Sequence, residues 1–133
     1  VVPSSGGFAL PPDSFAWQPT CHHTDRLLER SREFLDLEKS QYLFHFNVWG
    51  HSWEFDRDGN WGLIEEACEL LGGREEIWYA SYADIVANRR RWEALRFSVD
   101  MNLVENPAAE AVWVAVDGLP VEIPGGWRGR LSA

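Results

Sequence analysis

The sequence predicts an α/β fold in which residues 1–94 form part of a (β/α) barrel and residues 95–133 form a small antiparallel β appendage. Strand-like and helix-like segments alternate in the first part, and strands separated by helices imply parallel pairing. Only two or three such strands are visible, which is too few to close a barrel. After Leu95 the pattern changes to short β runs separated by turn signals, which indicates hairpins.

Length and charge restrict the class of protein. A chain of 133 residues can bury one good core, and 45% hydrophobic with 25% charged residues is ordinary for a globular protein. Twelve basic residues against 21 acidic ones give a net charge of -9, which argues against a nucleic-acid partner and against an anionic membrane surface. No run of eighteen apolar residues occurs, so we expect no membrane span.

The chain begins at Val1 without the charged and apolar regions of a signal peptide. We therefore expect a cytoplasmic protein, and we expect this chain to be a fragment or a processed part of a longer one. Cys21 and Cys68 form no C-x-x-C pair, which predicts two reduced and largely buried thiols. Most of the eight tryptophans should lie in the core, while a few exposed ones would suit stacking on sugar rings.

The N-terminal region is predicted to be a loop that leads into a helix. Residues 1–20 are interrupted by proline and glycine, with at most a short strand over residues 15–18. Thr24 is the expected N-cap of a helix from Asp25 to Leu37. Apolar side chains recur on one face of that helix at the helical spacing: Leu27, Leu28, Phe34 and Leu35.

The central strand is predicted at residues 42–49, in the stretch YLFHFNVWGHSWEF. Side chains alternate along a strand, so its two faces are read separately. One face is apolar: Phe44, Phe46 and Val48. The other face carries groups that line polar cavities: His45, Asn47, Trp49 and, after Gly50, His51. Because active sites of parallel barrels lie at the open ends of strands, His51 is the first functional candidate.

Two more helices are predicted after this strand. Residues 56–60 form a turn that feeds a helix from Trp61 to Leu71, which Gly72-Gly73 ends. Ser81 and Asp84 form a capping-box-like start to the next helix.

Short strands account for the remaining segments. Residues 77–80, reading IWYA, are predicted as a short buried strand. In the appendage, LRFSV, VWVAV and LPVEI are predicted strands, and Asp117-Gly118 is a strong hairpin signal between the last two.

Residues 45–81, HFNVWGHSWEFDRDGNWGLIEEACELLGGREEIWYAS, closely resemble a bacterial branch of the polysaccharide deacetylases of the carbohydrate esterase family four type. The resemblance extends upstream through FALPPDSFAWQPTCHHTD and downstream through FSVDMNLVENPAAEAVWVAVDG, so it covers nearly the whole chain. One departure is Ser81-Tyr82, where that branch often has Thr-Asn after Tyr-Ala.

The resemblance implies a fold and a chemistry. The fold would be a distorted (β/α) barrel, of which this chain would be the C-terminal half. The reaction would be hydrolysis of N- or O-acetyl groups on a carbohydrate, with a divalent metal, usually zinc, held by one Asp and two His. An Asp would act as the base, and a His on a late strand would protonate the departing amine. His51 is the one catalytic residue that the resemblance assigns here.

The metal ligands of that family are expected elsewhere. No Asp-Asp-Gly run and no His pair of the family's spacing occurs in these 133 residues. We therefore expect no metal on this chain alone and no catalysis by it alone. The expected partners are a carbohydrate substrate and either the missing N-terminal half or another copy of the chain.

Five residues near His51 are expected to contact substrate: His22, His23, Trp49, Trp53 and Glu54. Glu54 alternatively fixes the tautomer of the His51 imidazole or is a surface glutamate. The run Cys21-His22-His23 alternatively supplies metal ligands, although adjacent residues seldom both reach one ion and no fourth ligand is evident. A non-catalytic carbohydrate-binding module and a self-associating scaffold domain remain the alternative functions.

Overall fold

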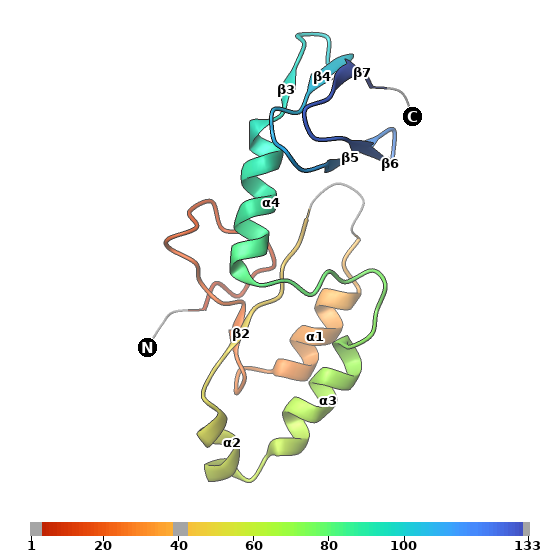
Figure 1. Ribbon diagram of the computed structural model, residues 1–133. Helices are drawn as coiled ribbons and strands as arrows, with labels where there is room; N and C mark the ends of the chain where they lie inside the picture. The colour runs from red at the N-terminus through yellow and green to blue at the C-terminus, as the bar shows by residue number, and fades with distance from the viewer. Residues whose placement is uncertain (1–3, 39–42, 132–133) are drawn as a thin grey trace. The chain divides into compact units, whose positions relative to one another are not determined.

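The structure, a computed structural model, describes residues 4–38 and 43–131 (Figure 1). In that part of the chain the protein is mixed α/β, with four helices and seven short strands that form no closed barrel. The chain divides into two compact units, Val1–Trp78 and Tyr79–Ala133. The sequence placed a boundary after residue 94, whereas the structural division comes earlier, because the helix that precedes residue 95 packs on a strand of the second unit.

A parallel pair of very short strands lies in the first unit. β1 (Cys21–His22) pairs in parallel with β2 (Val48–Trp49), and α1 (Leu27–Leu35) lies in the connection between them. The parallel arrangement predicted from the order of elements is therefore present. The regular strand is much shorter than the predicted residues 42–49, of which residue 42 lies outside the described part.

The stretch before β2 keeps the predicted alternation of side chains without forming a long strand. Phe46 and Val48 pack against the core of the first unit, whereas the buried His45 ring contacts Trp17 edge-on. Phe44 forms only an isolated antiparallel bridge, to Ala9.

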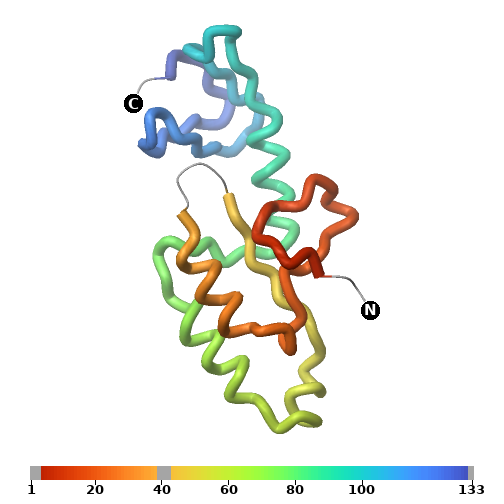
Figure 2. The backbone as a smooth tube through the Cα atoms, turned by 180° about the vertical axis from the view of Figure 1, so that it is seen from behind, coloured from red at the N-terminus to blue at the C-terminus, as the bar shows by residue number. Residues whose placement is uncertain are grey.

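Helices α1 and α3 (Trp61–Leu71) pack side by side, as Figures 1 and 2 show from opposite directions. Their shared core is centred on Cys21, Leu27 and Ala67. The bounds of α3 agree with the sequence prediction, whereas α1 begins two residues later than predicted. Its N-cap is Arg26 in the left-handed region, because the Thr24 hydroxyl is engaged by the ring of His22 instead.

The short helix α2 (Ser52–Asp58) was not predicted. The stretch stays extended through His51, which is the N-cap residue with φ -119° and ψ 137°. The carboxylate of Glu54 accepts a hydrogen bond of 2.9 Å from the backbone N–H of His51, which satisfies one donor at the helix start. The sequence had ended the strand at residue 49 and had placed a turn at residues 56–60, whereas this local cap starts a helix that runs from Ser52 to Asp58.

Residues 77–94 contradict one sequence prediction and confirm another. Residues 77–80 form no strand, so the predicted IWYA strand is wrong, and Trp78 is exposed. Helix α4 (Tyr82–Ala94) begins as predicted, with the Ser81 hydroxyl accepting from the backbone N–H of Asp84 and the Asp84 carboxylate accepting from Ser81. Among the described helices, none is long and apolar enough to cross a membrane.

Five strands of the second unit form two antiparallel sheets. β4 (Leu103–Glu105) lies between β3 (Arg96–Phe97) and β7 (Arg128–Arg130). β5 (Val112–Val116) and β6 (Leu119–Ile123) form the hairpin that the sequence predicted.

The turn of that hairpin and the core beside it are well specified. Asp117 and Gly118 both have positive φ, 52° and 81°, which the tight two-residue hairpin turn requires. The buried core of the second unit is apolar and draws on several strands: Leu95, Val104, Val112 and Ile123.

One buried amide ties the loops of the second unit to its sheets. The Asn106 side chain is fully buried, and its Nδ2 group donates to the carbonyl oxygens of Glu110, Ile123 and Pro124 at 2.9, 3.0 and 3.1 Å. Its Oδ1 accepts from the backbone N–H of Ala108 at 3.0 Å. Every polar atom of the side chain is thereby satisfied, as burial demands.

Candidate functional site

The predicted site residues gather at one edge of the β1–β2 pair. Because the two strands are parallel, their C-terminal ends meet at the same edge, and the residues that follow them are brought together. His23 follows β1, and Gly50 and His51 follow β2. The register places His22 opposite Trp49, whose rings meet edge-on with centroids 4.8 Å apart.

Glu54, in the first turn of α2, is the centre of this group. Its Oε2 atom lies 3.3 Å from Nε2 of His22 and 3.7 Å from Nδ1 of His23. The same oxygen accepts the hydrogen bond from the backbone N–H of His51. The Glu54 carboxylate therefore contacts the backbone of His51 and the imidazole rings of His22 and His23.

Hydrogen bonding and nearby imidazoles favour the charged form of Glu54. The backbone N–H of His51 is the main cause of a lowered pKa for this carboxyl, and His22 and His23 act in the same direction. Desolvation opposes the shift but does not reverse it. At neutral pH the site therefore presents a carboxylate to its two neighbouring imidazoles.

The ring of His22 is held on both of its nitrogens. Nδ1 lies 2.8 Å from the hydroxyl oxygen of Thr24 and 3.3 Å from the Thr24 backbone nitrogen, and Nε2 faces Glu54. The backbone N–H of Thr24 donates to Nδ1, so in the neutral ring the proton is on Nε2 and faces the Glu54 carboxylate. Thr24 thus fixes the ring orientation.

His23 is the most enclosed residue of the site. Its side chain is 2% exposed and is packed between the rings of His22 and Phe55, with centroids 4.2 and 4.4 Å away. Neither ring nitrogen has a hydrogen-bond partner among the described residues. Gly50 makes this position possible, because a Cβ at residue 50 would lie 2.0 Å from Nδ1 of His23.

His51 and Trp53 form the exposed part of the site. The two rings stack, with centroids 5.7 Å apart and planes 17° apart, and Trp53 is 55% exposed. The His51 ring also meets Trp49 edge-on at 6.1 Å. The guanidinium of Arg57 lies over the Trp53 ring, 5.1 Å from its centroid. An exposed imidazole beside an exposed indole can meet a ligand that approaches from solvent.

All six predicted site residues are therefore connected by direct contacts. Sequence reasoning missed the positioning roles of Thr24 and Phe55, and it gave Gly50 only the turn before His51, not the space that the His23 ring occupies. Thr24 had been assigned to a helix cap, and no helix had been predicted over the residues that include Phe55. Of the two cysteines, Cys21 is buried as expected, and burial raises the pKa of its thiol, whereas Cys68 is exposed rather than buried.

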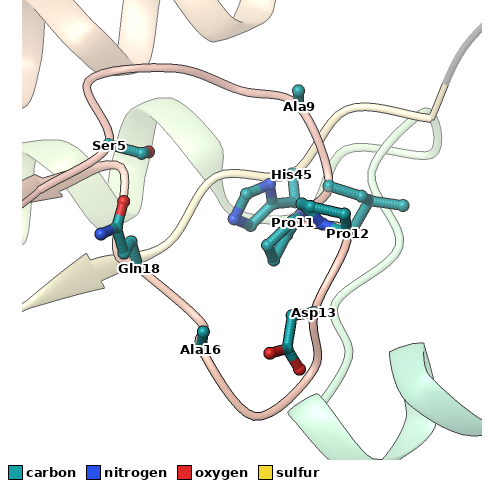
Figure 3. Close-up of a pocket in the computed structure, with 9 residues that line it drawn as sticks. Ser5, Ala9, Pro11, Pro12, Asp13, Ala16, Gln18 and His45 are labelled. Carbon is teal, nitrogen blue, oxygen red and sulfur yellow. The ribbon is translucent and has the colours of Figure 1, made fainter.

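A second feature of the first unit is a cavity of about 370 Å³ under the N-terminal loop. Figure 3 shows the loop from Ser5 to Gln18 curving around it, with the ring of His45 reaching in beside Pro11. Nδ1 of His45 lies 3.3 Å from the carbonyl oxygen of Phe8. The cavity contains one carboxylate, from Asp13, but the structure gives no contact that links it to the group around Glu54.

Comparisons with known proteins found no match: no protein-family model, no curated protein and no solved structure is similar to this chain.

Proposed function

We propose that this chain is the C-terminal portion of a metal-dependent polysaccharide deacetylase, in which His51 is the general acid. The observation that carries the proposal is the convergence of His51, Trp49 and Trp53 at the C-terminal edge of a parallel strand pair. In (β/α) barrels this edge is where catalytic residues lie. The sequence resemblance over residues 45–81 supports the same assignment.

The strand pair itself supports a barrel that is completed by other strands. Parallel strands normally belong to larger sheets that helices cover on both faces. Here two strands of two residues each pair with one another, and helices α1 and α3 pack side by side over their core. A second segment, either an N-terminal half or another copy of the chain, would supply the missing strands.

The chemistry that falls to His51 is the transfer of one proton. In hydrolysis of an acetamide, water adds to the carbonyl carbon, the C–N bond breaks, and the amine nitrogen takes a proton as it leaves. His51 is exposed and its ring stacks on the exposed Trp53, so a substrate that approaches from solvent can reach the imidazole that would donate that proton. For an O-acetyl group the same proton would go to the departing alkoxide.

A divalent metal would activate the attacking water in such an enzyme. The Asp-Asp-Gly run and the His pair that hold this metal in the resembled family are absent from the 133 residues. No step at that metal is therefore assigned to the residues of this chain. Its own contribution would be proton donation by His51 and binding of the sugar by the aromatic residues beside it.

The aromatic residues favour a sugar as the ligand. The exposed Trp53 ring and the half-buried Trp49 ring flank His51, and indole faces pack well on the C–H surfaces of sugar rings. One face of Trp53 is in contact with His51, so a sugar stacked on the indole would lie close to the imidazole.

The test is release of acetate from N-acetylated and O-acetylated oligosaccharides by the complete deacetylase of which the proposal makes this chain a part. The proposal expects metal-dependent release of acetate, and it expects the isolated chain to release none. Trp53→Ala should raise KM, while Trp113→Ala, which removes an equally exposed indole from the second unit, should leave KM unchanged. Absence of acetate release from every acetylated glycan tested would contradict the proposal.

The exposed Trp53 also favours a second candidate, a carbohydrate-binding module without catalysis. That function predicts that the protein binds glycans without releasing acetate and that His51→Ala leaves this binding intact. Tryptophan fluorescence measures the binding.

A self-associating scaffold is favoured by the short, open β1–β2 pair, which another strand could extend. A monomer in sedimentation at micromolar concentration would contradict the scaffold.

A further inference from the structure

Among the residues of the site that the structure describes, His23 is the one with two buried ring nitrogens that lack a hydrogen-bond partner. Only 2% of His23 is exposed, and neither nitrogen of its ring has a hydrogen-bond partner among the described residues. Buried imidazoles are normally hydrogen-bonded, because an unpaired polar atom away from water is unfavourable. The Nδ1 atom faces the Glu54 carboxylate at 3.7 Å, which is too far for a hydrogen bond.

We propose that His22, His23 and Glu54 together bind one divalent transition-metal ion, with zinc as the best match. Each residue offers one ligand atom, and these three atoms lie within 4.8 Å of one another. The inference concerns this chain's own residues and departs from the expectation that the chain alone carries no metal. It is independent of the deacetylase proposal, and either can fail without the other.

The spacing of the ligand atoms is close to that of an occupied site. Metal–ligand distances of about 2.0–2.1 Å at tetrahedral angles place two ligand atoms about 3.3 Å apart. The distance from His22 Nε2 to Glu54 Oε2 is 3.3 Å, and that from His23 Nδ1 to the same oxygen is 3.7 Å. Two of the three spacings are thus near the ideal value, and all three atoms lie within 4.8 Å of one another, so the side chains must move closer together to hold an ion.

Two adjacent histidines reach the same point because the strand ends between them. His22 is the last residue of β1, and the chain turns immediately afterwards, with the N–H of Asp25 donating to the carbonyl of His22 at 2.8 Å. In a continuing strand the rings would point to opposite faces. Here they lie on one side, with centroids 4.2 Å apart and planes 37° apart.

The surroundings of the ligands have the features of a metal site. Nδ1 of His22 faces the Thr24 hydroxyl at 2.8 Å, which orients the ring so that Nε2 is directed at the ion. The backbone N–H of His51 holds Glu54 in place. Two imidazoles and one carboxylate are the protein ligands of several catalytic zinc sites, which leave a further position for water or substrate.

The binding test uses the purified 133-residue chain, stripped with a chelator and dialysed. Titration calorimetry with Zn²⁺ should give one ion per chain, and Glu54→Gln and His22→Asn should each weaken binding by at least about 100-fold. Glu66→Gln removes an exposed carboxylate on α3 that pairs with Arg32, and it should leave zinc affinity unchanged. Circular dichroism shows whether each variant is folded.

Two further readouts keep the proposal falsifiable if a ligand variant fails to fold. Thr24→Val removes only the hydroxyl that orients His22 and should weaken zinc binding by about 10-fold or more. Cobalt(II) bound to the wild-type chain should show visible absorption bands that Glu54→Gln lacks. No zinc binding by the wild-type chain at micromolar concentration, or zinc binding that survives both Glu54→Gln and Thr24→Val unchanged, would overturn the proposal.

Discussion

The Nδ1 atom of His23 occupies space that a side chain on Gly50 would need: a Cβ there would lie 2.0 Å from that nitrogen. The contact joins the residue after β1 to the residue after β2, so the parallel pairing of two very short strands fixes the position of a buried imidazole. Gly50 also has φ of 154°, a conformation that other residues rarely adopt. The position of the His23 ring beside Glu54 therefore requires a glycine at residue 50.

Gly50→Ala should therefore displace His23 and destabilise the first unit. We expect a loss of about 1–3 kcal/mol in the free energy of unfolding, the usual cost of overpacking a buried position. Urea unfolding followed by far-UV circular dichroism measures this. The matched control is Gly62→Ala on the exposed face of α3, where the new methyl group meets nothing within 4 Å and should leave stability equal or higher. Equal stability of the two variants would contradict the role given to Gly50.

Asn106→Ala should destabilise the second unit strongly. The substitution removes the Asn106 donor from one buried and two part-buried hydrogen bonds to carbonyl oxygens, so we expect a loss of about 2–4 kcal/mol in the free energy of unfolding. Asn102→Ala serves as the control, because Asn102 is exposed and its amide bonds only to exposed neighbours. A loss below about 1 kcal/mol for Asn106→Ala would show that water replaces these bonds.

The stability of the protein should depend on the protonation of His45. Burial lowers the pKa of this imidazole below its ordinary value of 6.5, and the hydrogen bond to the Phe8 carbonyl opposes that shift only in part. Below that ordinary value the unfolded chain binds a proton that the folded chain does not, so stability falls as pH decreases through it. Above that pH the contribution of the neutral ring is fully present.

His45→Gln should remove this contribution to the pH dependence. Urea unfolding at pH 5 and at pH 7.5 gives the loss of stability on acidification for each protein. We expect a smaller loss for His45→Gln than for the wild type. An identical loss would show that the His45 ring becomes protonated without unfolding the loop around it.

The sequence predicted several elements of both units. The apolar periodicity of residues 61–71 and the Ser81–Asp84 cap specify helices through local contacts, and both are present. The Asp117-Gly118 turn needs two positive φ values, which these residues tolerate well. The alternation before β2 correctly separated the core-facing Phe46 and Val48 from His45.

What the sequence did not predict depends on contacts between distant segments. The sequence indicated a strand to residue 49 and a turn at residues 56–60, but the Glu54 carboxylate bonds to the backbone of His51 and a helix starts there. Thr24 resembles a helix cap, yet the His22 ring takes its hydroxyl. The convergence of His22, His23 and Glu54 follows from strand pairing across 27 residues of chain, from Cys21 to Val48, which residue patterns alone do not specify.

The central claim is that His51 donates a proton in a deacetylation reaction, and steady-state kinetics of His51→Ala tests it most directly. In the deacetylase to which we assign this chain, acting on an N-acetylated oligosaccharide, the variant should lose about 10²–10⁴-fold in kcat with little change in KM, the usual contribution of a general acid. Unchanged metal content would show that the loss is one of proton donation. A kcat within about twofold of the wild type would remove His51 from the mechanism and contradict the account.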